Sequence, residues 1–282
     1  KAVGCASTGN LAAATAAHAA KAGIPCYVFV PADTEANKIL QAATYGAQII
    51  AVKGTYDEAN RLAAQAADEH EWALLNLNIR PYYTEGSKTL AFEVCEQLGW
   101  RAPEKIIVPM GSGALLCAVW RGLKQFEDLG LIDGLKTEII GAQPQGCSPI
   151  VEAFKTNSGN IVPVEKPETI AKSLAIGDPG DGIYAADIVR ESGGIAESAT
   201  DEEIVEGIKL LAKTEGIFAE PAGGVAIAVL KRLVESGQVQ RDGEVACCVT
   251  GSGFKSPDAI IGAVSKPLEI QPTLEDLRKI VR

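Results

Sequence analysis

The chain has 282 residues, of which 47% are hydrophobic and 22% are charged. This is a globular composition, long enough for one large or two modest domains. The net charge of -10 leaves no basic face for a phosphodiester backbone, and the apolar runs are far shorter than the roughly 20 residues of a bilayer span. We therefore expect a protein that binds neither nucleic acid nor membrane.

Short apolar runs alternate with amphipathic patterns along the chain. Strands are predicted at residues 2–6, 26–30, 48–52, 73–77, 106–110, 138–142 and 245–250. Helices with a 3.6-residue period are predicted at residues 11–22, 36–45, 57–69, 85–98, 115–129, 201–214 and 223–236. Residues 155–167 lack periodicity and predict a surface excursion. Repeated strand, helix, strand units predict an α/β fold with doubly wound, mostly parallel sheets.

The alternation is interrupted at residues 80–83, Arg-Pro-Tyr-Tyr. We place a boundary there, which predicts a smaller N-terminal lobe at residues 1–82 and a larger lobe at residues 83–282. We expect no signal peptide at the start of residues 1–282, because Lys1 leads directly into the first predicted strand. A protein seldom begins in a strand, so we expect a further segment before Lys1.

The seven cysteines are an odd number, scattered without a C-x-x-C pair, and the chain has only two histidines. This spacing predicts reduced thiols in the core, not disulfides or metal ligands. We therefore expect a cytoplasmic protein without a metal site.

Three strand-to-helix junctions combine glycine with hydroxyl or amide side chains. They are residues 7–10, Ser-Thr-Gly-Asn (the Asn10 turn), residues 111–115, Gly-Ser-Gly-Ala-Leu (the Gly113 turn), and residues 250–253, Thr-Gly-Ser-Gly (the Thr250 turn). A helix start after a glycine offers open N–H groups and partial positive charge to an anion. The alternative for any single junction is an ordinary tight turn with a Ser or Thr cap.

Two known phosphate-binding motifs do not match these junctions. The dinucleotide pattern G-x-G-x-x-G fails because residue 116 is leucine, and the P-loop fails because no G-K-S or G-K-T follows a turn. Six segments in order instead resemble the threonine synthase family of pyridoxal-phosphate (PLP) enzymes, within the fold-type-II superfamily of the tryptophan synthase β chain. The segments are residues 5–10, 80–89, 111–113, 172–177, 220–224 and 250–253.

The resemblance implies two lobes with the PLP site in the cleft between them, and a homodimer. It implies that Asn10 donates to the phenolic oxygen of PLP, that the Gly113 turn wraps the phosphate, and that Thr250 faces the pyridine nitrogen. The implied cofactor-binding residues are Asn10, Gly111, Ser112, Gly113, Ala114, Leu115 and Thr250. The implied substrate-binding residues are Ser7 and Thr8 for the α-carboxylate, and Asn78, Arg80 and Lys88, with Ser112 as a further candidate, for the second anion.

The reaction that the resemblance implies is conversion of O-phospho-L-homoserine and water to L-threonine and phosphate. The alternatives are a threonine or serine ammonia-lyase, a cysteate-synthase-like enzyme, and a non-catalytic PLP- or phosphate-binding fragment. The chain departs from the family at Leu11, where many members have threonine, and at Tyr83, where the family has arginine. The family's Schiff-base lysine lies in a Ser-Phe-Lys-Asp-Arg segment that residues 1–282 do not contain, so no catalytic residue is assigned.

Overall fold

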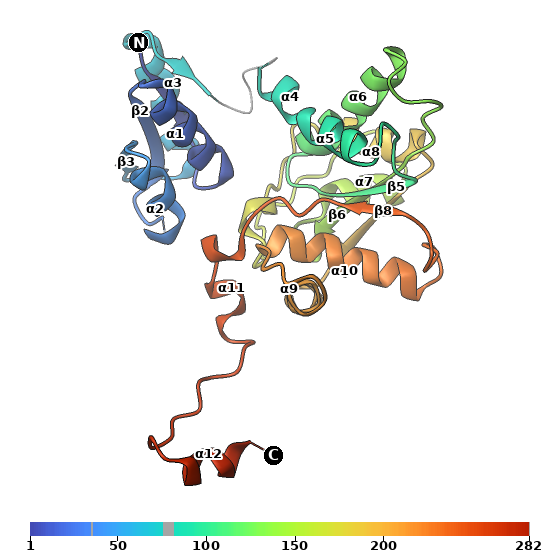
Figure 1. Ribbon diagram of the computed structural model, residues 1–282. Helices are drawn as coiled ribbons and strands as arrows, with labels where there is room; N and C mark the ends of the chain where they lie inside the picture. The colour runs from blue at the N-terminus through green and yellow to red at the C-terminus, as the bar shows by residue number, and fades with distance from the viewer. Residues whose placement is uncertain (35, 76–81, 282) are drawn as a thin grey trace.

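The computed structural model describes residues 1–34, 36–75 and 82–281. They form two four-stranded sheets in which every paired strand is parallel (Figure 1). The strands of the first sheet are β1 (Val3–Ala6), β2 (Cys26–Pro31), β3 (Gln48–Val52) and β4 (Ala73–Leu74), in the order β3-β2-β1-β4. Its helices are α1 (Asn10–Ala22), α2 (Ala36–Thr44) and α3 (Tyr56–Glu69). The predicted parallel α/β architecture is confirmed.

The first sheet is covered on both faces, as parallel sheets require. Cys5 and Val28 point to one face and pack with alanines of α1 and α2. Ala6 and Phe29, their neighbours along the strands, point to the other face and pack with alanines of α3. The period of two along each strand therefore divides the apolar residues between two thin layers of core.

The second sheet has the strands β5 (Lys105–Pro109), β6 (Glu138–Pro144), β7 (Ile195–Ala199) and β8 (Val245–Cys247), in the order β7-β6-β5-β8. The α-helices that precede β8 are α4 (Tyr82–Ser87), α5 (Thr89–Gln97), α6 (Ala114–Asp128), α7 (Pro149–Lys155), α8 (Gly182–Glu191), α9 (Asp201–Glu215) and α10 (Pro221–Glu235). The other helical segments that the structure describes in this part of the chain are η1 (Gln145–Cys147), η2 (Lys172–Leu174), η3 (Gly253–Lys255), α11 (Asp258–Ile261) and α12 (Leu274–Ile280). One face packs against α5 to α8 and the other against α9 and α10.

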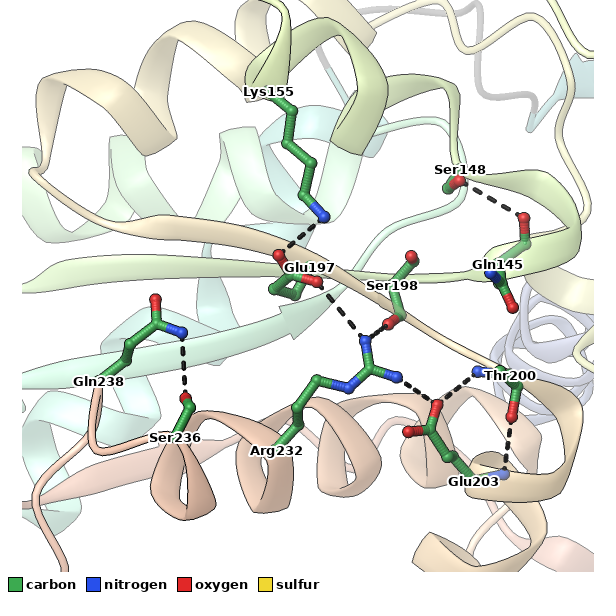
Figure 2. Close-up of polar contacts among 10 residues, drawn as sticks. All are labelled: Gln145, Ser148, Lys155, Glu197, Ser198, Thr200, Glu203, Arg232, Ser236 and Gln238. Atoms are coloured by element: carbon green, nitrogen blue, oxygen red, sulfur yellow. Dashed lines mark hydrogen bonds and ion pairs between the residues drawn. The ribbon is translucent and has the colours of Figure 1, made fainter.

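An ion-pair network joins α10 to the edge strand β7 and to α9 (Figure 2). Arg232 of α10 donates to the Ser198 carbonyl at 2.5 Å and pairs with Glu203 of α9. Its Nη1 also lies 3.6 Å from Glu197, which pairs with Lys155 of α7 at 2.8 Å. The network fixes the position of α10, whose first turn contributes to the site described below.

Helix α9 begins with a capping box: the Thr200 hydroxyl accepts from the Glu203 N–H at 3.2 Å, and the Glu203 carboxylate accepts from the Thr200 N–H at 2.8 Å. We expect Thr200→Ala to lower the free energy of unfolding by about 1 kcal/mol, because the Glu203 N–H loses its partner. Urea denaturation measures this. The matched control is Thr214→Ala in the last turn of the same helix, where no cap is removed. Equal effects of the two substitutions would contradict the prediction.

The predicted elements differ from the structure in several places. Residues 85–98, predicted as one helix, are divided at Lys88 into α4 and α5. The hydroxyls of Ser87 and Thr89 donate to the carbonyls of Tyr83 and Gly86, at 3.0 and 2.8 Å, and so compete with the helical hydrogen bonds. The strand predicted at residues 245–250 ends at Cys247, and β7 and the pair α7 and α8 were not predicted. The surface excursion predicted at residues 155–167 is confirmed apart from Lys155, which ends α7: residues 156–167 contain neither helix nor strand and are mostly exposed.

Three further observations on the described residues concern membrane spans, metal ligands and thiols. None of their helices combines the length and the apolar character that a bilayer crossing demands. Within the same ranges, no three His, Cys, Asp or Glu side chains are grouped as metal ligands would be. All seven cysteines are free, as predicted, and six of them are buried.

Candidate functional site

Both sheets have a topological switch point at their first strand. β1 lies between β2 and β4, and β5 lies between β6 and β8. In open parallel sheets, ligands bind outside the carboxyl ends of the strands at such a point, where connections leave to opposite sides. The Asn10 turn follows β1, the Gly113 turn follows β5, and the Thr250 turn comes after β8. All three glycine junctions therefore lie at the edges where ligands are expected.

Two hydrogen bonds of Ser7 stabilise the Asn10 turn. The Ser7 N–H donates to the Phe29 carbonyl of β2 at 3.2 Å, and the Ser7 hydroxyl accepts from the Gly9 N–H at 3.2 Å. Gly9 caps α1 without any side-chain hydrogen bond. The first N–H groups of this helix of 13 residues therefore have no side-chain cap and can bind an anion.

The Gly113 turn is pressed against the segment that follows η2. Gly113 has a left-handed backbone at φ 88°, and a Cβ placed there would lie 2.9 Å from the Asp181 carbonyl oxygen. A Cβ on Gly111 would lie 3.1 Å from Cδ1 of Ile176. Ser112 ties the turn together, because its carbonyl accepts from the Asp181 N–H at 3.0 Å and its hydroxyl accepts from the Ala114 N–H at 3.3 Å.

This turn fits the phosphate of PLP. Its glycines allow the tight backbone of the turn, and Gly113, the N-cap residue of α6, has no side chain to cap the first N–H groups of the helix. The side chain of Leu115 packs against the core, so this residue can offer an incoming phosphate its backbone N–H alone.

Asn10 and Thr250, both predicted to face the cofactor ring, are brought into direct contact. The Asn10 amide nitrogen donates to the Thr250 carbonyl at 3.3 Å and to the Glu220 carboxylate at 3.4 Å. The Thr250 hydroxyl also donates to Glu220, at 3.5 Å. Lys255 pairs with Glu220 at 2.8 Å and donates to the amide oxygen of Asn10. One buried carboxylate thus joins the start of α1, the Thr250 turn and a lysine of η3.

Glu220 is placed at the start of α10 by its backbone. Its N–H donates to the Gly251 carbonyl at 2.9 Å, and Pro221 begins the helix after it. A Cβ on Gly251 would lie 2.2 Å from Oε1 of Glu220. The glycine of the Thr250 turn is therefore what lets this carboxylate approach the site.

No role was predicted for Glu220 or Lys255 from the sequence. Glu220 nevertheless lies in the segment 220–224, and Lys255 comes two residues after the segment 250–253. The signal was a lone carboxylate in the apolar run Phe218-Ala219-Glu220-Pro221-Ala222. A buried carboxylate requires a cation or several donors.

The residues predicted to hold the second anion are placed only in part. Asn78 and Arg80 lie outside the described residues. Lys88 lies between α4 and α5, where its ammonium contacts Glu85 at 2.7 Å and the Gln125 side chain at 3.3 Å. Its role in substrate binding stays a prediction.

The thiols near the site are poor nucleophiles. Burial raises the pKa of Cys247 and of Cys248 to about 12. Burial likewise raises the pKa of Cys5, in the strand before the Asn10 turn, to about 11. These side chains stay protonated at neutral pH and act as apolar packing.

Solved structures share the fold. The processed form of threonine deaminase isoform 2 from Solanum lycopersicum matches with a TM-score of 0.76 and 21% identity, over 93% of this chain and 73% of that one. Maize serine racemase matches with a TM-score of 0.73 and 24% identity, over 89% of this chain and 73% of that one. At such identities the likeness shows the fold alone.

Comparisons of sequence are more specific. The family model described as "Pyridoxal-phosphate dependent enzyme" matches residues 1–251. The threonine synthase of Methanocaldococcus jannaschii is 46% identical over 281 residues, which are 99% of this chain and 69% of that enzyme. The threonine synthase of Bacillus sp. (strain ULM1) is 37% identical over 282 residues, covering 99% of this chain and 76% of that enzyme. The chain therefore belongs to the threonine synthase family of pyridoxal-phosphate-dependent enzymes.

Proposed function

We propose that this protein converts O-phospho-L-homoserine and water to L-threonine and phosphate, at a site formed by the Asn10, Gly113 and Thr250 turns. The observation that carries the proposal is the contact between Asn10 and Thr250, at 3.3 Å across 240 residues of chain. This contact brings together two residues that the family resemblance assigns to the cofactor ring. The identity to threonine synthases supports this reaction over that of the structurally similar deaminase and racemase.

PLP supplies an electron sink for the negative charge that develops next to the amino-acid nitrogen. The chain's own residues hold it there. The N–H groups of the Gly113 turn bind its phosphate, the Asn10 amide donates to its phenolic oxygen, and Thr250 faces its ring nitrogen. We propose that the site lies in the cleft between a lobe of residues 1–82 and a lobe of residues 83–282.

The substrate carries two anions, and the chain offers donors for each. Ser7, Thr8 and the open N–H groups at the start of α1 bind the α-carboxylate. Asn78, Arg80 and Lys88 bind the substrate phosphate, for which a guanidinium fork and neutral donors are suited. We further propose a cytoplasmic homodimer; the free thiols fit a reducing compartment, and the dimer rests on the family resemblance.

The test is a set of parallel assays on the full-length protein loaded with PLP. We expect phosphate release from O-phosphohomoserine with matching formation of threonine. Release of a 2-oxo acid from threonine or serine, without phosphate release, would identify an ammonia-lyase instead. PLP binding with neither product would identify the non-catalytic alternative.

A further inference from the structure

The amide of Asn10 has two chemically different ends, and each end meets a partner that fixes which way it points. Lys255 carries only donors, so its ammonium can bond only to the amide oxygen. The ionised Glu220 carries only acceptors, so it can bond only to the amide nitrogen, which lies 3.4 Å away. Charge therefore sets the orientation of an amide that is itself exposed.

Lys255 and Glu220, the two partners of Asn10, also form an ion pair with each other. Nζ of Lys255 lies 2.8 Å from Oε2 of Glu220, and their side chains are 18% and 6% exposed. A pair this sheltered is screened little by salt, and neither charge can lose the other without a large penalty. The pair is anchored in the backbone, because Glu220 opens α10 and Lys255 lies in η3.

We propose that Lys255, together with Glu220, is a positioning residue that turns the N–H end of the Asn10 amide toward the bound cofactor. The inference rests on the proposed function, in which Asn10 donates to the phenolic oxygen of PLP. The bonds from the amide nitrogen to Glu220 and to the Thr250 carbonyl are long, at 3.4 and 3.3 Å. One N–H can therefore leave them for a stronger, charged acceptor, while Lys255 keeps its place on the amide oxygen.

Without the cation, the amide oxygen loses its donor, and only the long bonds from the amide nitrogen to Glu220 and to the Thr250 carbonyl, at 3.4 and 3.3 Å, favour this orientation. A rotated amide would place its carbonyl oxygen against the phenolic oxygen of PLP, so that two acceptors face each other and a hydrogen bond is lost. Asn10 would then remain in place while losing its function.

The experiment is an equilibrium titration of the protein with PLP, followed by absorbance and by tryptophan fluorescence. We expect Lys255→Met to raise the dissociation constant roughly tenfold, the equivalent of one hydrogen bond. Lys255→Arg, which keeps the cation, should bind within about twofold of wild type. The matched control is Lys213→Met on α9, an exposed lysine whose removal should change nothing.

A double-mutant cycle separates positioning from general stability. In an Asn10→Ala background, Lys255→Met should have no further effect on PLP affinity, because the amide that it orients is gone. If Lys255→Met alone does not fold, the double variant Glu220→Gln, Lys255→Met leaves no unpaired buried charge, and its affinity should fall by the same roughly tenfold.

The outcomes distinguish the positioning role of Lys255 from the proposed function on which it rests. Wild-type affinity in a folded Lys255→Met variant, Lys255→Arg as weak as Lys255→Met, or full additivity with Asn10→Ala would each overturn the positioning role. Failure of the wild-type protein to bind PLP would instead overturn the proposed function.

Discussion

Replacing Gly113 by alanine is expected to abolish PLP binding and to lower the free energy of unfolding by about 2–4 kcal/mol. The backbone at φ 88° disfavours any residue with a Cβ. The added atom would also lie 2.9 Å from the Asp181 carbonyl oxygen and 3.0 Å from Cβ of Ala185. The turn would have to move away from the segment that supports it, and its N–H groups would move with it. Urea denaturation and PLP titration measure the two effects.

Gly130→Ala is the matched control for this substitution. Gly130 also has a left-handed backbone, at φ 67°, but nothing lies within 4 Å of a Cβ built there. It should lose only the backbone contribution, about 1–2 kcal/mol, and should bind PLP normally. If Gly113→Ala behaved like Gly130→Ala in both measurements, the close approach to Asp181 would contribute neither to stability nor to PLP binding.

Gln143→Leu is expected to lower the free energy of unfolding by about 3 kcal/mol, since three buried backbone groups lose their partner. The Gln143 side chain is fully buried in β6. Its oxygen accepts from the N–H groups of Ile150 and Val151 in the first turn of α7, at 2.9 and 3.0 Å. Its nitrogen donates to the carbonyl of Met110 at 3.4 Å, immediately before the Gly113 turn.

The same substitution should weaken PLP binding, because the Met110 carbonyl that supports the turn loses its donor. Gln97→Leu, at the exposed end of α5, is the control for replacing glutamine by leucine. Calorimetric unfolding compares the two variants. A Gln143→Leu protein as stable as Gln97→Leu would mean that the freed backbone groups find other partners.

Much of the fold could be predicted because it depends on local pattern. Strand β3 was predicted at residues 48–52 and is observed at Gln48–Val52, since its apolar run is bounded by turn residues. β7 was not predicted, because Ile195–Ala199 contains Glu197 and Ser198 and carries few large apolar side chains. Its pairing with β6 and the ion pairs of Glu197 compensate for that composition, and these are tertiary contacts.

Part of the site could likewise be predicted from the sequence, and part could not. The Asn10 and Thr250 turns could be identified from motifs, because glycine and short polar residues at strand ends leave a local signal. The pairing of Glu220 with Lys255 could not, since it requires α10 and η3 to be packed side by side around a glycine. A sequence shows that a buried carboxylate needs a cation, but only the packing shows which cation it receives.

The contact between Asn10 and Thr250 also bears on the order in which the molecule assembles. Asn10 and Thr250 are 240 positions apart, and the chain between them must be gathered before they can meet, whereas α9 and α10 are neighbours in sequence and can pack early. We expect the cofactor cradle to be among the last parts to form. A chain emerging from the ribosome would then become able to hold its cofactor only after the Thr250 turn has been synthesised and released.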